Sequence, residues 1–305
     1  MATNRIKLPG ASGNRNAPVK DWSAAEMGLW RYADPYVADR SGIWIDASSD
    51  WLYRNGGPSD DPAGYALIDR LGDRIFTSGI GARHPITVRD TATGKPCLLF
   101  GAGGAGPNVL ADGNNGDLEA KSRIDARGQE VNRLPLWDKD RGFSRAFVVR
   151  IPQPNQTLNG VTFGSAVGGA ILGGGADSGS PFVDVAFDTG NLTYYYGSGG
   201  VFSAADYRNG NLTKIIETLE PTNNPAQFRY NMWINDPTGA PDVTGLTPAL
   251  PDGDKAYPRI GGIGKTVISG PLRGFLFGLV YLPGPIFNDE AARTTAFAWL
   301  TERSA

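Results

Sequence analysis

Apolar and polar residues alternate along much of the second half of the chain, with the period of two that is typical of β-strands with one buried face. Phe147, Val149 and Ile151 share one face of such a segment, and residues 228–235 alternate in the same way. A nearly continuous apolar run at residues 273–282 indicates a strand covered on both faces. Strands are predicted at residues 43–45, 51–53, 86–88, 97–100, 109–110, 145–151, 170–172, 182–188, 192–196, 228–235 and 273–282.

The period changes near both ends of the chain. Residues 21–33 are predicted to form a short helix, because Ser23 and Glu26 have the spacing of a capping box. Residues 292–300 are predicted to form a second helix with Asn288 as its N-cap. Its apolar stripe is formed by Ala296, Phe297 and Leu300.

Turn residues separate the predicted strands: the chain holds 42 glycines and 22 prolines. Many short strands joined by turns favour an all-β, antiparallel β-sandwich, closed here by a short C-terminal helix. All-β domains reach 305 residues, so residues 41–305 are predicted to form one domain. Within it, residues 112–141 are charged and lack periodicity, which indicates a long surface loop. Residues 1–40 are predicted to be an arm or docking segment, with a frayed terminus as the alternative for the first 21 residues.

Composition excludes several classes of function. The formal net charge is -2 and the charges are interspersed, so nothing favours binding to nucleic acid or to an anionic membrane. Cys97 is the only cysteine, which excludes an intrachain disulfide, and we expect it to be a buried, inert thiol. His84 is the only histidine, so a site with several histidine ligands is excluded and a Ser-His-Asp triad would need this residue.

Targeting and nucleotide motifs are not found. Residues 1–10 lack an apolar run after a basic start, so we expect no secretory signal. The apolar run at 275–282 is too short to span a bilayer, and we expect no membrane insertion. The glycine-rich run at 101–106 is followed by Pro107 and has no lysine at the Walker position, which argues against a phosphate loop.

Four segments, in order along the chain, resemble the concanavalin A-like lectin/glucanase superfamily, and specifically the laminin-G-like jelly rolls of phage and bacterial surface proteins. They are residues 67–88, 93–104, 228–239, and 258–264 followed by 274–300. Each is strand-and-turn sequence that is weak by itself, and their shared order carries the resemblance. The chain departs from the family pattern at Phe287 and Asn288, where the family has leucine and serine. The resemblance implies a jelly roll but leaves the ligand open, because this fold hosts many functions.

Five residues are predicted to contact a carbohydrate. Aromatic faces stack on sugar rings, an arginine offers a planar fork of donors, and a carboxylate accepts hydrogen bonds from hydroxyls. Ordinary core or edge packing is the alternative for the aromatic residues. The predicted residues are Asp184, Tyr194, Tyr196, Arg229 and Trp233.

A catalytic alternative and a metal alternative remain open. Glucanases of the superfamily carry acidic residues that alternate on one strand, and Asp184 and Asp188 are the nearest match. Ala186 stands between them, so solvated aspartates are the favoured interpretation and no catalytic residue is predicted. We predict no cofactor, with calcium as the alternative because turn aspartates offer oxygen ligands. These aspartates are Asp46, Asp50, Asp60, Asp61 and Asp69.

The sequence hypothesis is a non-enzymatic structural or adhesion component of a phage or phage-like particle, a head or tail spike or fibre that binds a host-surface glycan. It would reside in the particle and become extracellular after lysis. Other particle proteins would bind the N-terminal arm, and edge strands allow a homo-oligomer. The alternatives are a glycoside hydrolase acting on a surface polysaccharide and a structural virion protein without a ligand.

Overall fold

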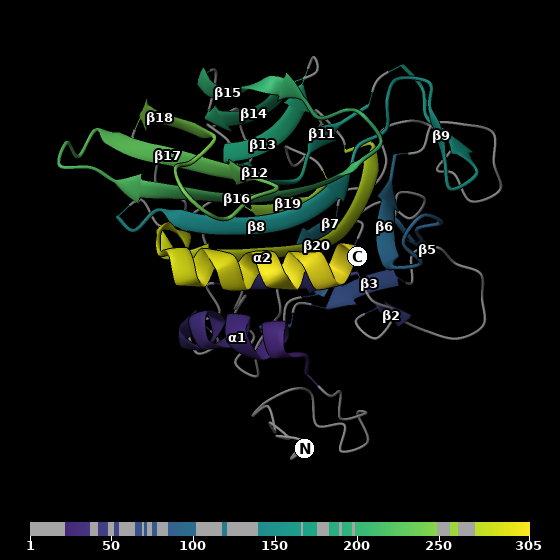
Figure 1. Cartoon of the computed structure of the whole chain (residues 1–305), viewed down its shortest axis with the longest axis horizontal. Coiled ribbons are helices and arrows are strands. Elements are labelled where there is room, and N and C mark those ends of the chain that lie inside the picture. The colour runs from purple at the N-terminus through teal and green to yellow at the C-terminus, as the bar shows by residue number, and fades with distance from the viewer. Residues whose placement is uncertain are drawn as a thin grey trace, which may run out of the picture.

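The computed structural model places two antiparallel β-sheets face to face and stacks two helices on the outer side of one sheet (Figure 1). This architecture confirms the predicted antiparallel β-sandwich with a short C-terminal helix. The structure describes residues 22–36, 42–47, 52–54, 65–68, 70–71, 75–77, 85–101, 118–120, 140–165, 167–175, 183–188, 191–196, 199–248, 257–261 and 272–305. The predicted strand at 109–110 and the first 21 residues of the predicted arm lie outside these ranges.

Sheet A carries the two helices. Its strand order is β18-β17-β16-β8-β20-β6-β5, and β1 also pairs with β20. Its strands are β1 (Ile43–Asp46), β5 (Ile86–Arg89), β6 (Pro96–Phe100), β8 (Phe143–Arg150), β16 (Leu212–Pro221), β17 (Gln227–Ile234), β18 (Val243–Pro248) and β20 (Gly274–Pro283).

Sheet B forms the other layer, with the order β15-β14-β13-β12-β19-β7-β4-β3-β2 and with β11 paired to β13. Its strands are β2 (Leu52–Arg54), β3 (Tyr65–Ile68), β4 (Ile75–Thr77), β7 (Leu118–Ala120), β11 (Gly169–Ala170), β12 (Leu172–Gly175), β13 (Val183–Asp188), β14 (Asn191–Tyr196), β15 (Gly199–Asp206) and β19 (Tyr257–Ile260). A separate hairpin joins β9 (Thr157–Leu158) to β10 (Val161–Thr162).

Strand β20 lies in the middle of sheet A and is buried along its whole length, as its apolar run predicts. One of its edges pairs with β8, while the other pairs first with β6 and then with β1. On its outer face, Gly278 lets the helix approach closely, because a Cβ built there would lie 2.7 Å from Cη2 of Trp299.

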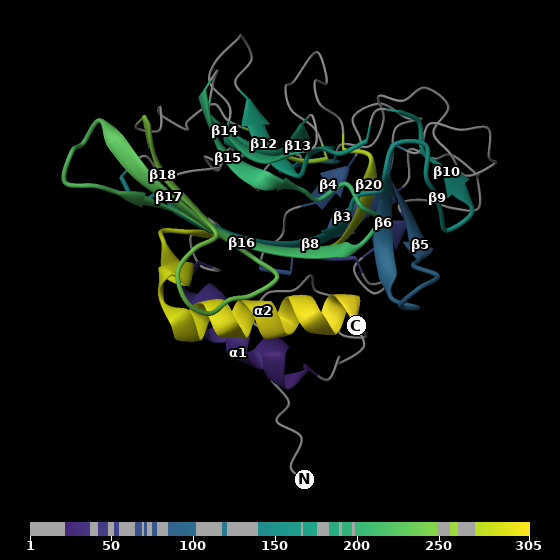
Figure 2. The same cartoon turned by 45° about the horizontal axis from the view of Figure 1, so that its top comes forward.

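The helices are α1 (Ala24–Ala33), which a short 3-10 turn η1 (Asp34–Tyr36) follows, and α2 (Glu290–Ser304), which a short 3-10 turn η4 (Ile286–Asn288) precedes. Helix α2 packs on β8, β16 and β20, and α1 packs on α2 (Figure 2). The capping box of Ser23 and Glu26 is present, as predicted. Neither helix of the described part is long and apolar enough to cross a membrane.

Two predictions about elements are corrected, and a central strand of sheet A was missed. The N-cap of α2 is Asp289, whose side chain accepts a hydrogen bond from the backbone of Ala292, and not Asn288. Strand β7 lies inside the segment 112–141 that was predicted to be a loop, where it pairs with β19 and β4. Strand β16, in the middle of sheet A, was not predicted, because Glu217 interrupts the apolar pattern of its inner face.

Candidate functional site

The register of sheet A assigns its residues to an inner face, towards sheet B, and an outer face, towards the helices. Glu217 and Tyr230 face inward: they contact each other, and Arg145, paired opposite Glu217, donates to the carbonyl of Leu172 in sheet B. Thr218, one position further along β16, bonds instead with η4 on the outer side. Because faces alternate along a strand, Arg229 and Trp233 share the outer face of β17.

Six outer-face residues form two rows across β16, β17 and β18. The first row is Glu220, Arg229 and Leu246, and the second is Thr218, Asn231 and Thr244. Strand spacing gives these rows a footprint of roughly 10 Å across the strands and 7 Å along them. We call these six residues, together with Asn288 of η4, the outer ledge.

Hydrogen bonds hold the ledge in one arrangement. Asn288 donates to Glu220 at 2.7 Å and accepts from the Thr218 hydroxyl at 2.6 Å. The Asn231 amide donates to both Thr218 and Asn288 at 3.4 Å and accepts from the Thr244 hydroxyl at 2.9 Å. The amides are therefore fixed by neighbours on three different elements.

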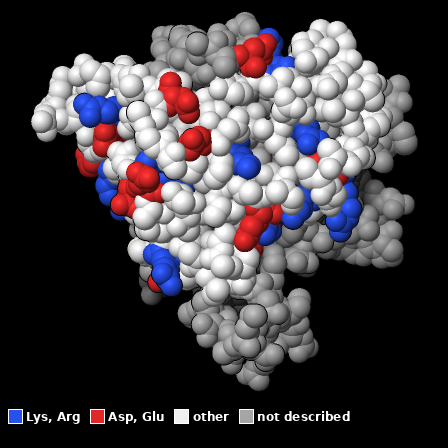
Figure 3. Space-filling view, in the orientation of Figure 1, with Lys and Arg blue, Asp and Glu red and all other residues white. Residues whose placement is uncertain are grey.

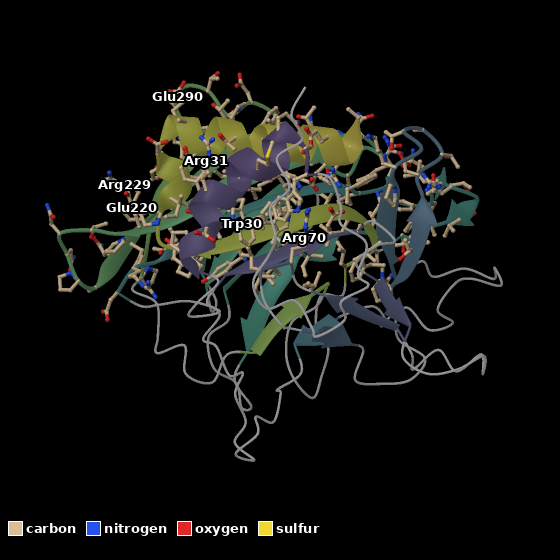
Figure 4. All side chains as sticks on the ribbon, turned by 90° about the horizontal axis from the view of Figure 1, so that it is seen from below. Trp30, Arg31, Arg70, Glu220, Arg229 and Glu290 are labelled. Atoms are coloured by element: carbon tan, nitrogen blue, oxygen red, sulfur yellow. The ribbon has the colours of Figure 1, made fainter. Side chains whose placement is uncertain are left out.

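Exposure rises from the base of the ledge to its first row. Asn231 is 8% exposed, whereas the side chains of Glu220 and Arg229 are 27% and 56% exposed. Leu246 is 57% exposed and is the one large hydrophobic residue exposed among the described residues. Figure 4 shows Glu220 and Arg229 next to each other, beyond the end of α2 that carries Glu290.

Among the described residues, Arg229 has one charged neighbour and no hydrogen bond that uses its guanidinium. Its guanidinium lies 3.8 Å from a Glu220 oxygen, and within the described ranges this is its one ion pair. A guanidinium offers five N–H donors in a plane. The ledge thus presents donors on Arg229, acceptors on Glu220 and an apolar surface on Leu246.

Trp233 lies beyond the ledge on the same face of β17, but it is only 5% exposed. The guanidinium carbon of Arg293 lies 4.1 Å from its ring centroid, and its indole N–H donates to the carbonyl of Gly239 at 3.2 Å. Arg293 also donates to the carbonyls of Pro237 and Phe287. Trp233 therefore helps to fasten the turn after β17 to α2.

The other three predicted sugar-binding residues lie in sheet B. Strands β13 and β14 pair Asp184 with Tyr195, Val185 with Tyr194 and Val183 with Tyr196. Asp184 therefore belongs to the ladder position between those of Tyr194 and Tyr196. The side chains of Asp184, Tyr194 and Tyr196 lie outside the described part of the structure. Since Arg229 and Trp233 face away from sheet B, the fold does not bring the five predicted residues together in one site.

The buried carboxylates among the described residues are all paired with arginines. At the junction of α1, β1 and α2, Arg70 donates to Glu26 at 2.8 Å and to Asp46 at 3.0 Å. Asp46 also accepts from Arg303 at 3.0 Å. Elsewhere, Asp90 pairs with Arg150 and Glu217 pairs with Arg145.

Burial has different consequences for two ionisable groups. Complete burial raises the pKa of Glu217 above its ordinary value, although Arg145 and the Tyr230 hydroxyl oppose this shift. Burial, with a smaller contribution from the nearby Asp90, raises the pKa of the Cys97 thiol to about 12. Glu217 is 0% exposed, so no substrate can reach this carboxyl group in the folded state.

Of the calcium candidates, Asp46 is buried, and both Arg70 and Arg303 donate to its Oδ2 oxygen, so their positive charges oppose a cation there. Asp50, Asp60, Asp61 and Asp69 lie outside the described residues, as does His84. No group of three or more His, Cys, Asp or Glu residues in the described part could hold a metal ion.

On the face shown in Figure 3, acidic and basic residues are interspersed.

No protein-family model and no curated protein sequence matches the chain. Among solved structures, a sialidase of Trypanosoma rangeli is similar over 92% of this chain and 39% of its own length, with 10% identity and a TM-score of 0.50. Domain 4 of AbnA, an extracellular arabinanase from Geobacillus stearothermophilus in complex with arabinotriose, is similar over 75% of this chain and 91% of its own, with 11% identity and a TM-score of 0.45. The receptor-binding domain of botulinum neurotoxin type G is similar over 84% of this chain and 50% of its own, with 12% identity and a TM-score of 0.45.

The chain therefore spans half or less of the sialidase and toxin chains that it resembles. At such low identity the likeness to the sialidase supports the β-sandwich fold and nothing beyond it. The finer assignment to the concanavalin A-like superfamily stays a prediction from the sequence.

Proposed function

We propose that this chain is a carbohydrate-binding β-sandwich that binds a glycan at the outer ledge without cleaving it. The observation that carries the proposal is the exposed Arg229, with unused donors, set between the Glu220 carboxylate and the apolar Leu246. Sugar rings present hydroxyls at their edges and C–H groups on their faces. A rigid set of donors, acceptors and one apolar side chain suits both surfaces at once.

Binding is preferred over catalysis because of where the shielded carboxylates lie. Most glycosidases use two carboxyl groups beside the scissile bond, one of them an acid with a raised pKa. The pKa of Glu217 is raised by burial, but this carboxyl group is enclosed between the sheets. Glu26, Asp46 and Asp90 are buried on arginines. The ledge itself contains a single carboxylate, Glu220.

The finer proposal is that the chain belongs to a phage or phage-like particle, as a spike or fibre component that contacts a host-surface glycan. This proposal rests on the resemblance of the chain to laminin-G-like jelly rolls of phage and bacterial surface proteins. Detection of the chain by immunogold labelling on purified particles would support it. Labelling confined to cell debris would contradict it.

A glycan-array experiment with product analysis tests the proposed function. Wild-type protein should bind one group of glycans saturably and release no new reducing ends from them. Arg229→Met should reduce the affinity at least roughly tenfold, because a charge-assisted hydrogen bond is lost. Arg31→Met, which changes the exposed arginine of α1, is the matched control and should bind like wild type. Cleavage of a bound glycan, or silence across the array, would overturn the proposal.

A further inference from the structure

The charges around the outer ledge are not balanced. Arg229 is the one basic residue of the ledge, and the Glu220 carboxylate already lies 3.8 Å from it. Two exposed acidic residues follow Asn288 directly in the chain, Asp289 and Glu290. Asp289 accepts a hydrogen bond from the backbone of Ala292, so it also compensates the positive N-terminal end of α2.

Glu220 is held in place and is not a mobile surface carboxylate. One of its oxygens accepts from Asn288 at 2.7 Å, and the other faces Arg229. Asn288 is itself fixed by the Thr218 hydroxyl. The negative charge is therefore maintained beside the guanidinium, where an acidic ligand group would have to bind.

The second row contributes no charge. Thr218 and Asn231 are 0% and 8% exposed and are bonded to each other, and Asn231 accepts from the hydroxyl of Thr244. Thr244 is the exposed member of this row, and its hydroxyl matches neutral sugar hydroxyls. A ligand on the exposed part of the ledge meets one arginine compensated by Glu220, the neutral hydroxyl of Thr244 and the apolar Leu246. The exposed first row is roughly 10 Å wide, which is comparable with a monosaccharide or disaccharide.

We infer that the ledge selects neutral sugars and that Glu220 is the residue that excludes acidic ones. This inference rests on the proposed function, since it names the ligand class of the same site. A uronic or sialic carboxylate placed on Arg229 would meet the Glu220 charge within a few ångströms. A neutral hydroxyl pair can instead donate to Glu220 and accept from Arg229 together.

The test compares glycans that differ by one carboxylate: glucose-terminated with glucuronic acid-terminated oligosaccharides, and galactose-terminated with galacturonic acid-terminated ones. Wild-type protein should prefer the neutral member of the pair that it binds. Glu220→Gln should shift the ratio of the two affinities towards the acidic member by at least roughly fivefold, the effect of a unit charge about 4 Å away in a water-like medium.

Asp34→Asn is the matched control, since it removes one exposed negative charge from η1 and should leave the ratio unchanged. A wild-type preference for the acidic member, or an equal shift in Glu220→Gln and Asp34→Asn, would overturn the inference while leaving glycan binding intact. Absence of binding to any neutral or acidic member would overturn the proposed function together with the inference. A folded Glu220→Gln protein is verified by its circular dichroism spectrum.

Discussion

Replacing Arg70 by methionine should detach helix α1 from the rest of the fold. The Arg70 side chain is fully buried, and its guanidinium carbon lies 4.8 Å from the ring centroid of Trp22 and 4.7 Å from that of Trp44. The same side chain neutralises Glu26 of α1 and Asp46 of β1. Methionine keeps much of the packing against the rings but removes the positive charge.

The cost follows from the carboxylate that loses its partner. Asp46 keeps Arg303 at 3.0 Å, whereas among the described residues the next cation to Glu26 is the same Arg303 at 3.8 Å. Leaving one buried carboxylate without its close partner costs about 3–5 kcal/mol, and two cation–π contacts add about 1–2 kcal/mol. Such a loss is comparable with the total stability of many domains, so α1 should open before the sandwich unfolds.

Hydrogen exchange measured by mass spectrometry reads this opening directly. In Arg70→Met, amides of residues 24–33 should exchange at least a hundredfold faster, while those of β8 and β20 should keep most of their protection. Adding Glu26→Gln should restore part of the protection of α1, because the buried negative charge that lost Arg70 is gone. Arg31→Met, on the exposed side of α1, is the control. Equal exchange of α1 in Arg70→Met and Arg31→Met would refute the reasoning.

Three further predictions concern the core. Cys97 should resist alkylation at pH 8 in the native protein and react rapidly in urea, because burial and the raised pKa keep the native thiol protonated. Fast labelling of the native protein would contradict this prediction. The raised pKa of Glu217 means that, above pH 4.5, the folded state holds a proton that the unfolded state has released. The stability of the wild type relative to Glu217→Gln should therefore fall as the pH rises from 4.5. Urea unfolding of both proteins at several pH values measures this difference, and a constant difference would contradict the prediction. Gly278→Ala should lose about 1–3 kcal/mol by overpacking against Trp299, whereas Gly164→Ala, where a Cβ meets open space, should be near neutral by thermal unfolding.

Elements with a regular pattern could be predicted from the sequence. The apolar run of β20, the alternation in β17 and the capping box of α1 all appear in the structure at the expected positions. Strand β16 could not be found in this way, because the charged Glu217 interrupts its apolar pattern. Glu217 is accommodated by Arg145 on β8 and by the hydroxyl of Tyr230 on β17, and these partners are known only from the register. The very short β7 has no pattern of its own and depends on pairing with β19 and β4.

The candidate site was predictable only in part. Arg229 was selected for the planar donors of its guanidinium, but its neighbours Glu220 and Leu246 come from strands whose register the sequence does not reveal. Trp233 was selected for its aromatic ring, and the stacking of Arg293 on that ring depends on how α2 lies over the turn after β17. A site built across three strands and a helix start becomes visible only when the register is known.

Isothermal titration calorimetry with the glycan that binds most tightly on the array tests the central claim most directly. Wild type, Arg229→Met and Arg31→Met are titrated with the same glycan, and the glycan is analysed for cleavage afterwards. The account predicts saturable binding by wild type and by Arg31→Met, at least roughly tenfold weaker binding by Arg229→Met, and an intact glycan. Equal affinity in all three proteins would place the site away from the outer ledge. A hydrolysed glycan would contradict the claim that this sandwich binds without catalysis.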